Sequence, residues 1–78
     1  MARKLPVKSG KELLQTLKKA NDVLRLTYKR TKGRHVILHN RFCRNFNVPL
    51  HNELKLGTLD GVIDNAGMTK EQFFEYDP

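Results

Sequence analysis

The apolar positions near the start of the chain predict a helix. Ser9, followed three residues later by Glu12, forms the capping box with which many helices begin. Apolar residues then recur at helical spacing, at Leu13, Leu14, Leu17 and Ala20. The opposite side of the predicted helix carries Lys11, Lys18 and Lys19. We expect this helix to run from about residue 9 to residue 20, where Asn21 and Asp22 can stop it.

The middle of the chain has the two-residue period of β-strands. Apolar and polar side chains alternate in the first strand, which places Tyr28 on its apolar face and Lys29 on its polar face. We expect strands at residues 23–29, 35–40 and 44–49, with a turn at residues 31–34. Asn40 and Arg41 close a hairpin between the last two strands, or a slightly longer loop to Cys43 does so.

A second apolar stripe at helical spacing follows the strands. Its members are Leu54, Leu56, Leu59, Val62, Ile63 and Ala66. Gly67 ends the stripe as the left-handed residue expected after a helix. Gly57 and Gly61 lie four residues apart within it and cost stability unless a neighbouring backbone needs the room.

The last segment carries a second capping box. Thr69 with Gln72 begins a short helical turn that places Phe73 and Phe74 on the core. The order of elements is therefore α-β-β-β-α, with no repeat and no linker between the segments. We expect one α+β domain over residues 1–78, with a three-stranded antiparallel sheet and helices packed on one of its faces.

The charge of the chain points to a polyanionic or acidic partner. Its 78 residues include 15 Lys and Arg but only eight Asp and Glu, which gives a net charge of +7. A small protein can simply carry an excess of Lys, but ten of these fifteen cations precede Gly33, whereas the last quarter is acidic. A domain of this size buries little surface, so we do not expect a deep substrate pocket.

Cysteine and hydropathy patterns favour the cytoplasm. Cys43 is the only cysteine, which excludes an internal disulfide and a cysteine-based zinc site and fits a reducing cytosol. The longest apolar run is Val36-Ile37-Leu38, far short of the roughly 20 residues that span a bilayer. Because Pro6 interrupts the start, we expect no signal peptide and no membrane association.

His35 is the candidate catalytic residue. RNA carries its own nucleophile, the 2'-hydroxyl, so a ribonuclease needs a proton acceptor, donors for the developing phosphorane charge and a grip on the backbone. An imidazole titrates near neutral pH, and His35 directly follows a basic run that would attract phosphate. The same histidine can also be a strand-edge residue that bonds only a carbonyl or water. We expect the basic surface beside it to bind RNA through Lys29, Arg30, Lys32, Gly33 and Arg34.

A metal-dependent mechanism fits the spacing poorly. His35 and His39 are four residues apart, which in a strand is roughly 13 Å and too far for one ion. Asp60 and Asp64 share a helix face and can hold magnesium through water, although such carboxylates are usually solvated. We therefore expect no metal and no other cofactor. His51 can contact RNA, assist as an acid, or be a plain surface histidine.

Five short motifs occur in a fixed order over nearly the whole chain. They are Ser9-Gly10-Lys11-Glu12-Leu13, Lys32-Gly33-Arg34-His35, Val48-Pro49 followed by His51, Leu54-Lys55-Leu56-Gly57-Thr58-Leu59 followed by Ile63, and Ala66-Gly67-Met68-Thr69-Lys70-Glu71-Gln72-Phe73. In this order the chain resembles the HicA family of small bacterial and archaeal toxins, which are mRNA interferases. The family pattern usually has Ser and a second His where this chain has Arg34 and Val36, and it commonly has a basic residue where this chain has Asp60.

The resemblance implies a fold, an activity and a partner. The implied fold is like that of double-stranded-RNA-binding domains. The implied activity is mRNA cleavage that depends on one histidine, His35 by position, and the implied inhibitor is a HicB-type antitoxin. Two other interpretations stay open. One is a non-catalytic RNA-binding module of the same fold, and the other is a protein-interaction domain whose basic face meets an acidic partner. The oligomeric state is open as well.

Overall fold

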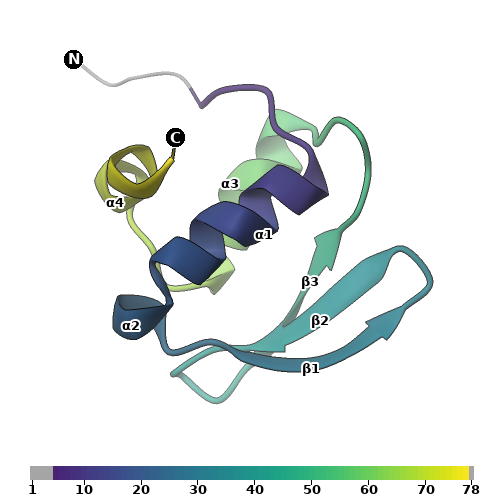
Figure 1. Cartoon of the computed structure of the whole chain (residues 1–78), viewed down its shortest axis with the longest axis vertical. Coiled ribbons are helices and arrows are strands. Elements are labelled where there is room, and N and C mark those ends of the chain that lie inside the picture. Colours follow the sequence, from purple (N-terminus) through teal and green to yellow (C-terminus); the bar gives the residue numbers. More distant parts are fainter. Residues whose placement is uncertain (1–4, 78) are drawn as a thin grey trace.

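Two helices precede three strands, and two further helices follow them (Figure 1). The computed structural model describes residues 5–77. Its elements are α1 (Gly10–Lys19), α2 (Asn21–Leu24), β1 (Thr27–Lys32), β2 (His35–His39), β3 (Asn45–Pro49), α3 (Leu56–Asn65) and α4 (Lys70–Tyr76). This order confirms the expected α+β class and its helix, three-strand, helix plan.

The three strands form one antiparallel sheet in the order β1-β2-β3. Alternate residues of β2 and β3 are buried, namely Val36, Leu38, Phe46 and Val48, and the residues between them are more exposed. A sheet with one buried and one open face has this alternation. The helices lie on the buried side (Figure 1), where Leu13, Leu17, Leu59, Ile63 and Phe73 complete the core.

Capping boxes begin α1 and α4, as the sequence predicts. The Ser9 hydroxyl accepts a hydrogen bond from the Glu12 N–H at 3.1 Å, and the Ser9 N–H donates to the Glu12 carboxylate at 3.0 Å. Thr69 and Gln72 exchange the same two bonds at α4. The bond from the Ser9 N–H is the main reason why the pKa of Glu12 lies below its ordinary value.

The segment after α1 differs from the predicted strand at residues 23–29. It forms the short helix α2, which ends at Arg25 in the left-handed conformation, with φ of 53°. The Asn21 side chain accepts a hydrogen bond at 2.8 Å from the N–H of Leu26. Such local bonds compete with strand pairing. The strand consequently begins later, at Thr27, and continues to Lys32 into the predicted turn.

The connection between β2 and β3 is the longer of the two predicted alternatives. Asn40 is 5% exposed, and its side-chain oxygen accepts hydrogen bonds from the N–H groups of Phe42 and Arg44. Its amide nitrogen donates to the carbonyl of Asn65, the last residue of α3. Asn40 therefore closes its own loop and also ties that loop to the end of α3.

Helix α3 begins at Leu56, later than the apolar stripe suggests, and Leu54, the first member of the stripe, is buried in the preceding loop. Gly67 follows the helix with φ of 80°, the left-handed conformation that the sequence predicts for it. Among residues 5–77, no atom outside the backbone of α3 lies within 4 Å of a Cβ built on Gly57 or Gly61. These two glycines therefore do not make room for a neighbouring backbone.

Gly10 is the glycine that permits a close approach. A Cβ at this position would overlap the carbonyl oxygen of Pro49, and it would lie 2.9 Å from the Cα of Leu50. The Gly10 N–H instead donates a hydrogen bond to the His51 carbonyl at 3.0 Å. The first turn of α1 thus rests directly on the backbone that follows β3.

We predict opposite effects of alanine at two glycines. Gly10→Ala is expected to lower the free energy of unfolding by about 1–3 kcal/mol, because its methyl group must displace backbone atoms. Gly61→Ala, at an exposed site within α3, is expected to raise it by about 0.5–1 kcal/mol. Urea unfolding of both variants measures the difference. A Gly10→Ala variant as stable as the wild type would contradict the close approach.

Candidate nucleic-acid interface

The turn that precedes His35 consists of two residues. Lys32 faces His35 across the β1-β2 ladder, so only Gly33 and Arg34 lie between the strands. Gly33 has φ of 59°, whereas the φ of Arg34 is not positive. A type II' turn has this pattern, with glycine at the first of its two central positions. The turn predicted at residues 31–34 is therefore shorter than expected, and Lys32 belongs to the strand.

His35 lies on the open side of the sheet. Its neighbours along β2, Val36 and Leu38, alternate with it and face the helices. Directly paired residues of antiparallel strands share a face. We call this side the outer face, and it comprises Thr27, Arg30, Lys32, His35, Ile37, His39, Asn45, Asn47 and Pro49. Position 36, where the HicA pattern has a second histidine, does not belong to it.

An irregularity in β1 determines which of its side chains reach the outer face. The pairing shifts between Tyr28 and Arg30, so that Lys29 is an extra residue in the strand. Tyr28 pairs with Leu38 on the helix side, whereas Arg30 pairs with Ile37 on the outer face. Strict alternation would have put Tyr28 on the same face as Arg30 and Lys32.

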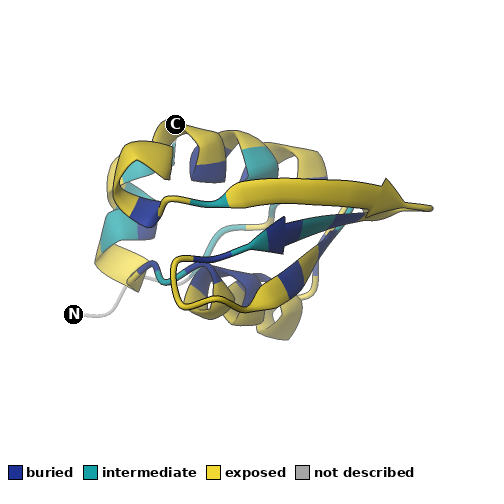
Figure 2. Cartoon of the chain, turned by 90° about the horizontal axis from the view of Figure 1, so that it is seen from below, coloured by how far each residue is buried: buried dark blue, intermediate teal, exposed yellow. Residues whose placement is uncertain are grey.

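The predicted RNA-binding residues consequently have different positions. Arg30 and Lys32 lie on the outer face with His35, and Gly33 and Arg34 form the adjoining turn. Lys29 is exposed at the bulge and has no partner in the ladder. All six residues of β1 are exposed, which makes this strand accessible along its length (Figure 2).

The outer face is hollowed at the end that carries His35. The concavity has a volume of about 530 Å³ and is lined by Lys32, Gly33, Arg34, His35, Ile37, Asn47 and His51. It is an open hollow with two imidazoles, an ammonium and a guanidinium around it. A polymer backbone can lie in such a hollow, and the cations favour a phosphate there.

His51 is close to His35 in space although sixteen residues separate them in sequence. The centroids of their rings are 6.3 Å apart, and the ring planes are inclined by 67°. The sequence raised an acid role for His51 as one of three alternatives, but no local pattern could bring it beside His35. That proximity depends on how the loop after β3 returns to the turn before β2.

His39 lies at the opposite end of β2 and takes no part in this concavity. Its Nδ1 is 2.8 Å from the side-chain oxygen of Asn45, its partner across the sheet. Within residues 5–77, no group of three or more His, Cys, Asp or Glu side chains could hold a metal ion. Asp60 instead lies 3.8 Å from the ammonium of Lys70 on the exposed surface.

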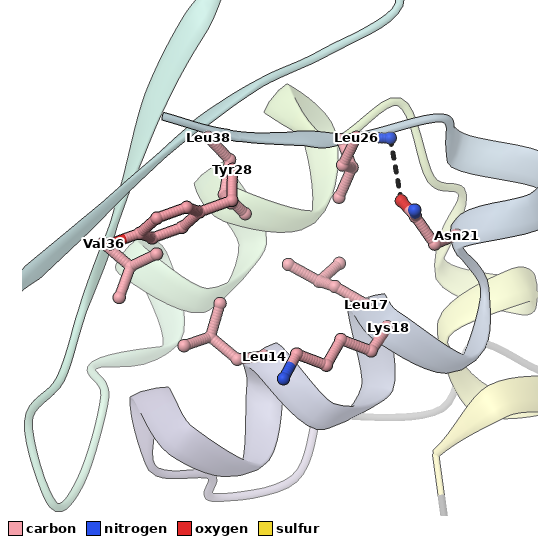
Figure 3. A pocket seen from close by; sticks show the side chains of 8 residues that line it. All are labelled: Leu14, Leu17, Lys18, Asn21, Leu26, Tyr28, Val36 and Leu38. Atoms are coloured by element: carbon pink, nitrogen blue, oxygen red, sulfur yellow. Dashed lines mark hydrogen bonds between the residues drawn. The ribbon is translucent and has the colours of Figure 1, made fainter. Parts of the chain in front are cut away.

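A second hollow lies on the helix side of β1. This groove has a volume of about 420 Å³ and runs between α1 and the sheet (Figure 3), with a lining of Leu14, Leu17, Lys18, Asn21, Leu26, Tyr28, Val36 and Leu38. The lining is mostly apolar and contains no histidine. The two sides of β1 therefore have different chemistry: cations and imidazoles on the outer face, and leucines in the α1-β1 groove.

Comparison with protein families, with curated proteins and with solved structures finds no match for this chain. The HicA resemblance stays a prediction from the motifs. Among residues 5–77, no helix has the length and apolarity that crossing a membrane requires.

Proposed function

We propose that this protein is a metal-independent endoribonuclease that cleaves mRNA, as the toxin of a HicA-type toxin-antitoxin pair. The observation that supports it most is the position of His35. This residue is exposed on the outer face, pairs with Lys32 across the sheet, and lines the concavity together with Arg34. The proposal also rests on the motif resemblance.

The chemistry needs little from a small domain. His35 takes the proton of the 2'-hydroxyl, and the resulting oxygen attacks the adjacent phosphorus. Lys32 and Arg34 stabilise the negative charge that develops on the phosphate oxygens. Arg30 and Lys29 hold the backbone further along β1. No metal is required, because the nucleophile belongs to the substrate. We place this activity in the cytoplasm, where mRNA is found and where the exposed thiol of Cys43 stays reduced.

The first prediction of this function concerns His35. We expect the wild type to cut single-stranded RNA in the presence of EDTA, to leave a 2',3'-cyclic phosphate, and not to cut the 2'-deoxy substrate. His35→Ala is expected to lose at least about 100-fold in rate, because general base catalysis typically contributes that much or more. Gel analysis of end-labelled RNA measures the cleavage.

His39→Ala is the matched control, because His39 is on the same strand and face but outside the concavity. It is expected to cleave like the wild type. Equal cleavage by His35→Ala and wild type would refute the assignment of His35. RNA binding without cleavage by the wild type would instead support the non-catalytic RNA-binding module.

The second prediction concerns the cations of the outer face. Replacing both Arg30 and Lys32 by Ala is expected to weaken binding of 2'-O-methyl RNA, which lacks the nucleophile and stays intact. The slope of log K against log salt should become shallower by about 1.4, which is about 0.7 for each phosphate that the variant no longer neutralises. Lys19→Ala, at the far end of α1, should leave the slope unchanged. An unchanged slope in the double variant would contradict an RNA site on this face.

A protein partner is the second function that the structure favours, and we propose it as the HicB-type antitoxin. The α1-β1 groove offers exposed apolar surface, and β1 is an edge strand with one side unpaired. Such an edge can accept a further strand from a partner. Lys18 lines the groove and Lys29 lies on the strand, so the segment that binds there is expected to be extended and acidic, with apolar side chains that enter the groove.

The third prediction tests this partner with the acidic protein that we expect the adjacent reading frame to encode. Tyr28→Ala is expected to weaken its binding by about 30-fold or more, because a buried interface tyrosine typically contributes about 2 kcal/mol or more. Phe42→Ala is the control. Phe42 is 58% exposed, almost the same as Tyr28 at 59%, but Phe42 lies in the β2-β3 loop, away from the groove. Calorimetric titration measures both. Equal affinities for both variants, or a neighbouring product that is not acidic, would contradict the proposal.

A further inference from the structure

We propose that His51 is the general acid of the same reaction, so that His35 and His51 act as a pair on one phosphodiester. This inference rests on the proposed ribonuclease function and deepens it, because it assigns the second proton transfer to a residue of this chain. It also makes the concavity between the two rings the place where the scissile phosphate binds.

The relative position of the two rings suits this role. Their centroids are 6.3 Å apart and their planes are inclined by 67°, so the rings do not stack on each other. At this separation both rings border one phosphate-sized site, so that one imidazole can contact the attacking oxygen and the other the leaving oxygen of the same phosphodiester. Both side chains are exposed and both line the same concavity with Lys32 and Arg34. A phosphate drawn in by these cations would meet both imidazoles.

Backbone hydrogen bonds and the packing of Leu50 against the core hold the loop that carries His51. Pro49, the last residue of β3, faces His35 across the sheet. The Leu50 N–H donates a hydrogen bond to the Arg34 carbonyl at 2.6 Å, and the His51 carbonyl accepts one from Gly10 at 3.0 Å. The loop is thereby fixed to the turn before β2 and to the start of α1.

The imidazole of His51 contributes no hydrogen bond to this fixation within residues 5–77, although its ring lies edge-on to that of His35. Within residues 5–77 its ring nitrogens have no hydrogen-bond partner, in contrast to His39, whose Nδ1 is bonded to Asn45. A side chain that is held in place by its backbone but unbonded at its ring can bind a substrate. Replacing the ring should therefore leave the fold intact.

The proton balance of the reaction calls for such a group. His35 removes the proton from the 2'-hydroxyl, the 2'-oxygen forms a bond to phosphorus, and the bond from phosphorus to the 5'-oxygen breaks. Protonated His51 gives its proton to that 5'-oxygen as it leaves. The products are a 2',3'-cyclic phosphate and a 5'-hydroxyl, and one proton has passed from His51 to RNA while another has passed from RNA to His35.

The other cations of the concavity suit this step less well. Arg34 and Lys32 carry a guanidinium and an ammonium, which serve less often than imidazole as proton donors in enzymes. Imidazole changes its charge between pH 5 and 8 and is the most frequent general acid or base in enzymes. His51 is thus the group in the concavity that is best matched to the leaving oxygen.

The experiment compares His51→Ala with His35→Ala and with the control His39→Ala, on two RNA substrates. One is ordinary RNA, and the other has sulfur in place of the 5'-bridging oxygen at one site, a leaving group that needs no general acid. On ordinary RNA, kcat of His51→Ala is expected to fall by about 10²–10⁴-fold. Binding of 2'-O-methyl RNA should change by less than about threefold, and circular dichroism should report an unchanged fold.

The sulfur substrate separates the two roles. It should restore the rate of His51→Ala to within about tenfold of the wild type, whereas His35→Ala should stay inactive because its base is still missing. In the pH profile of kcat on ordinary RNA, His51→Ala should lose the decline at high pH that deprotonation of an acid causes.

Each failure has a separate meaning. If His51→Ala cleaves ordinary RNA like the wild type, or if the sulfur substrate does not rescue it, the acid role is overturned while the ribonuclease proposal stands. If the wild type cleaves neither substrate, the ribonuclease proposal fails and the acid role fails with it. If His39→Ala loses as much activity as His51→Ala, the effect is not specific to the concavity and the pairing is refuted.

Discussion

The close approach of Gly10 to the backbone after β3 is the contact on which the rest of this structure depends. Gly10 is the first residue of α1, where helical N–H groups lack partners within the helix, and the His51 carbonyl satisfies its N–H. Because Gly10 has no side chain, α1 can lie against Pro49 and bury Leu13 and Leu17 above the sheet. The same bond fixes the loop that brings His51 to His35. The core and the candidate site therefore share this backbone contact.

The second constraint is the division of β1 between two faces. The strand carries an aromatic residue and several cations in close succession, and a regular strand would place Tyr28 with Arg30 and Lys32. The extra residue at Lys29 separates them, so that Tyr28 borders the apolar groove while the two cations join His35. A bulge is therefore the feature that keeps the polar outer face distinct from the apolar groove. In the function that we propose, RNA and the protein partner therefore bind different sides of one strand.

Elements whose signals are local could be predicted from the sequence. The two capping boxes each involve residues three apart, and β2 and β3 follow from alternation that the sheet leaves intact. The beginning of β1 could not be predicted, because the Asn21 side chain bonds Leu26 and a helical turn replaces the first residues of the expected strand. The bulge at Lys29 depends on how β1 pairs with β2, and the approach of His51 depends on a contact between segments far apart in sequence, so neither follows from the local alternation of side chains. The candidate site was thus predictable in its central residue, His35, but not in its geometry.

The size of the domain restricts what chemistry it can support. A chain of this length buries one small core, which here lies between one face of the three-stranded sheet and the helices. Few residues remain outside this core to enclose a pocket. An open concavity cannot exclude water or surround a small molecule, but it can hold a polymer by its phosphates and place two imidazoles beside one bond. RNA is well suited to such a site because it brings its own nucleophile and binds through repeated charge. Selectivity on such a surface has to come from the shape and flexibility of the RNA around the cut, because few base edges can be enclosed.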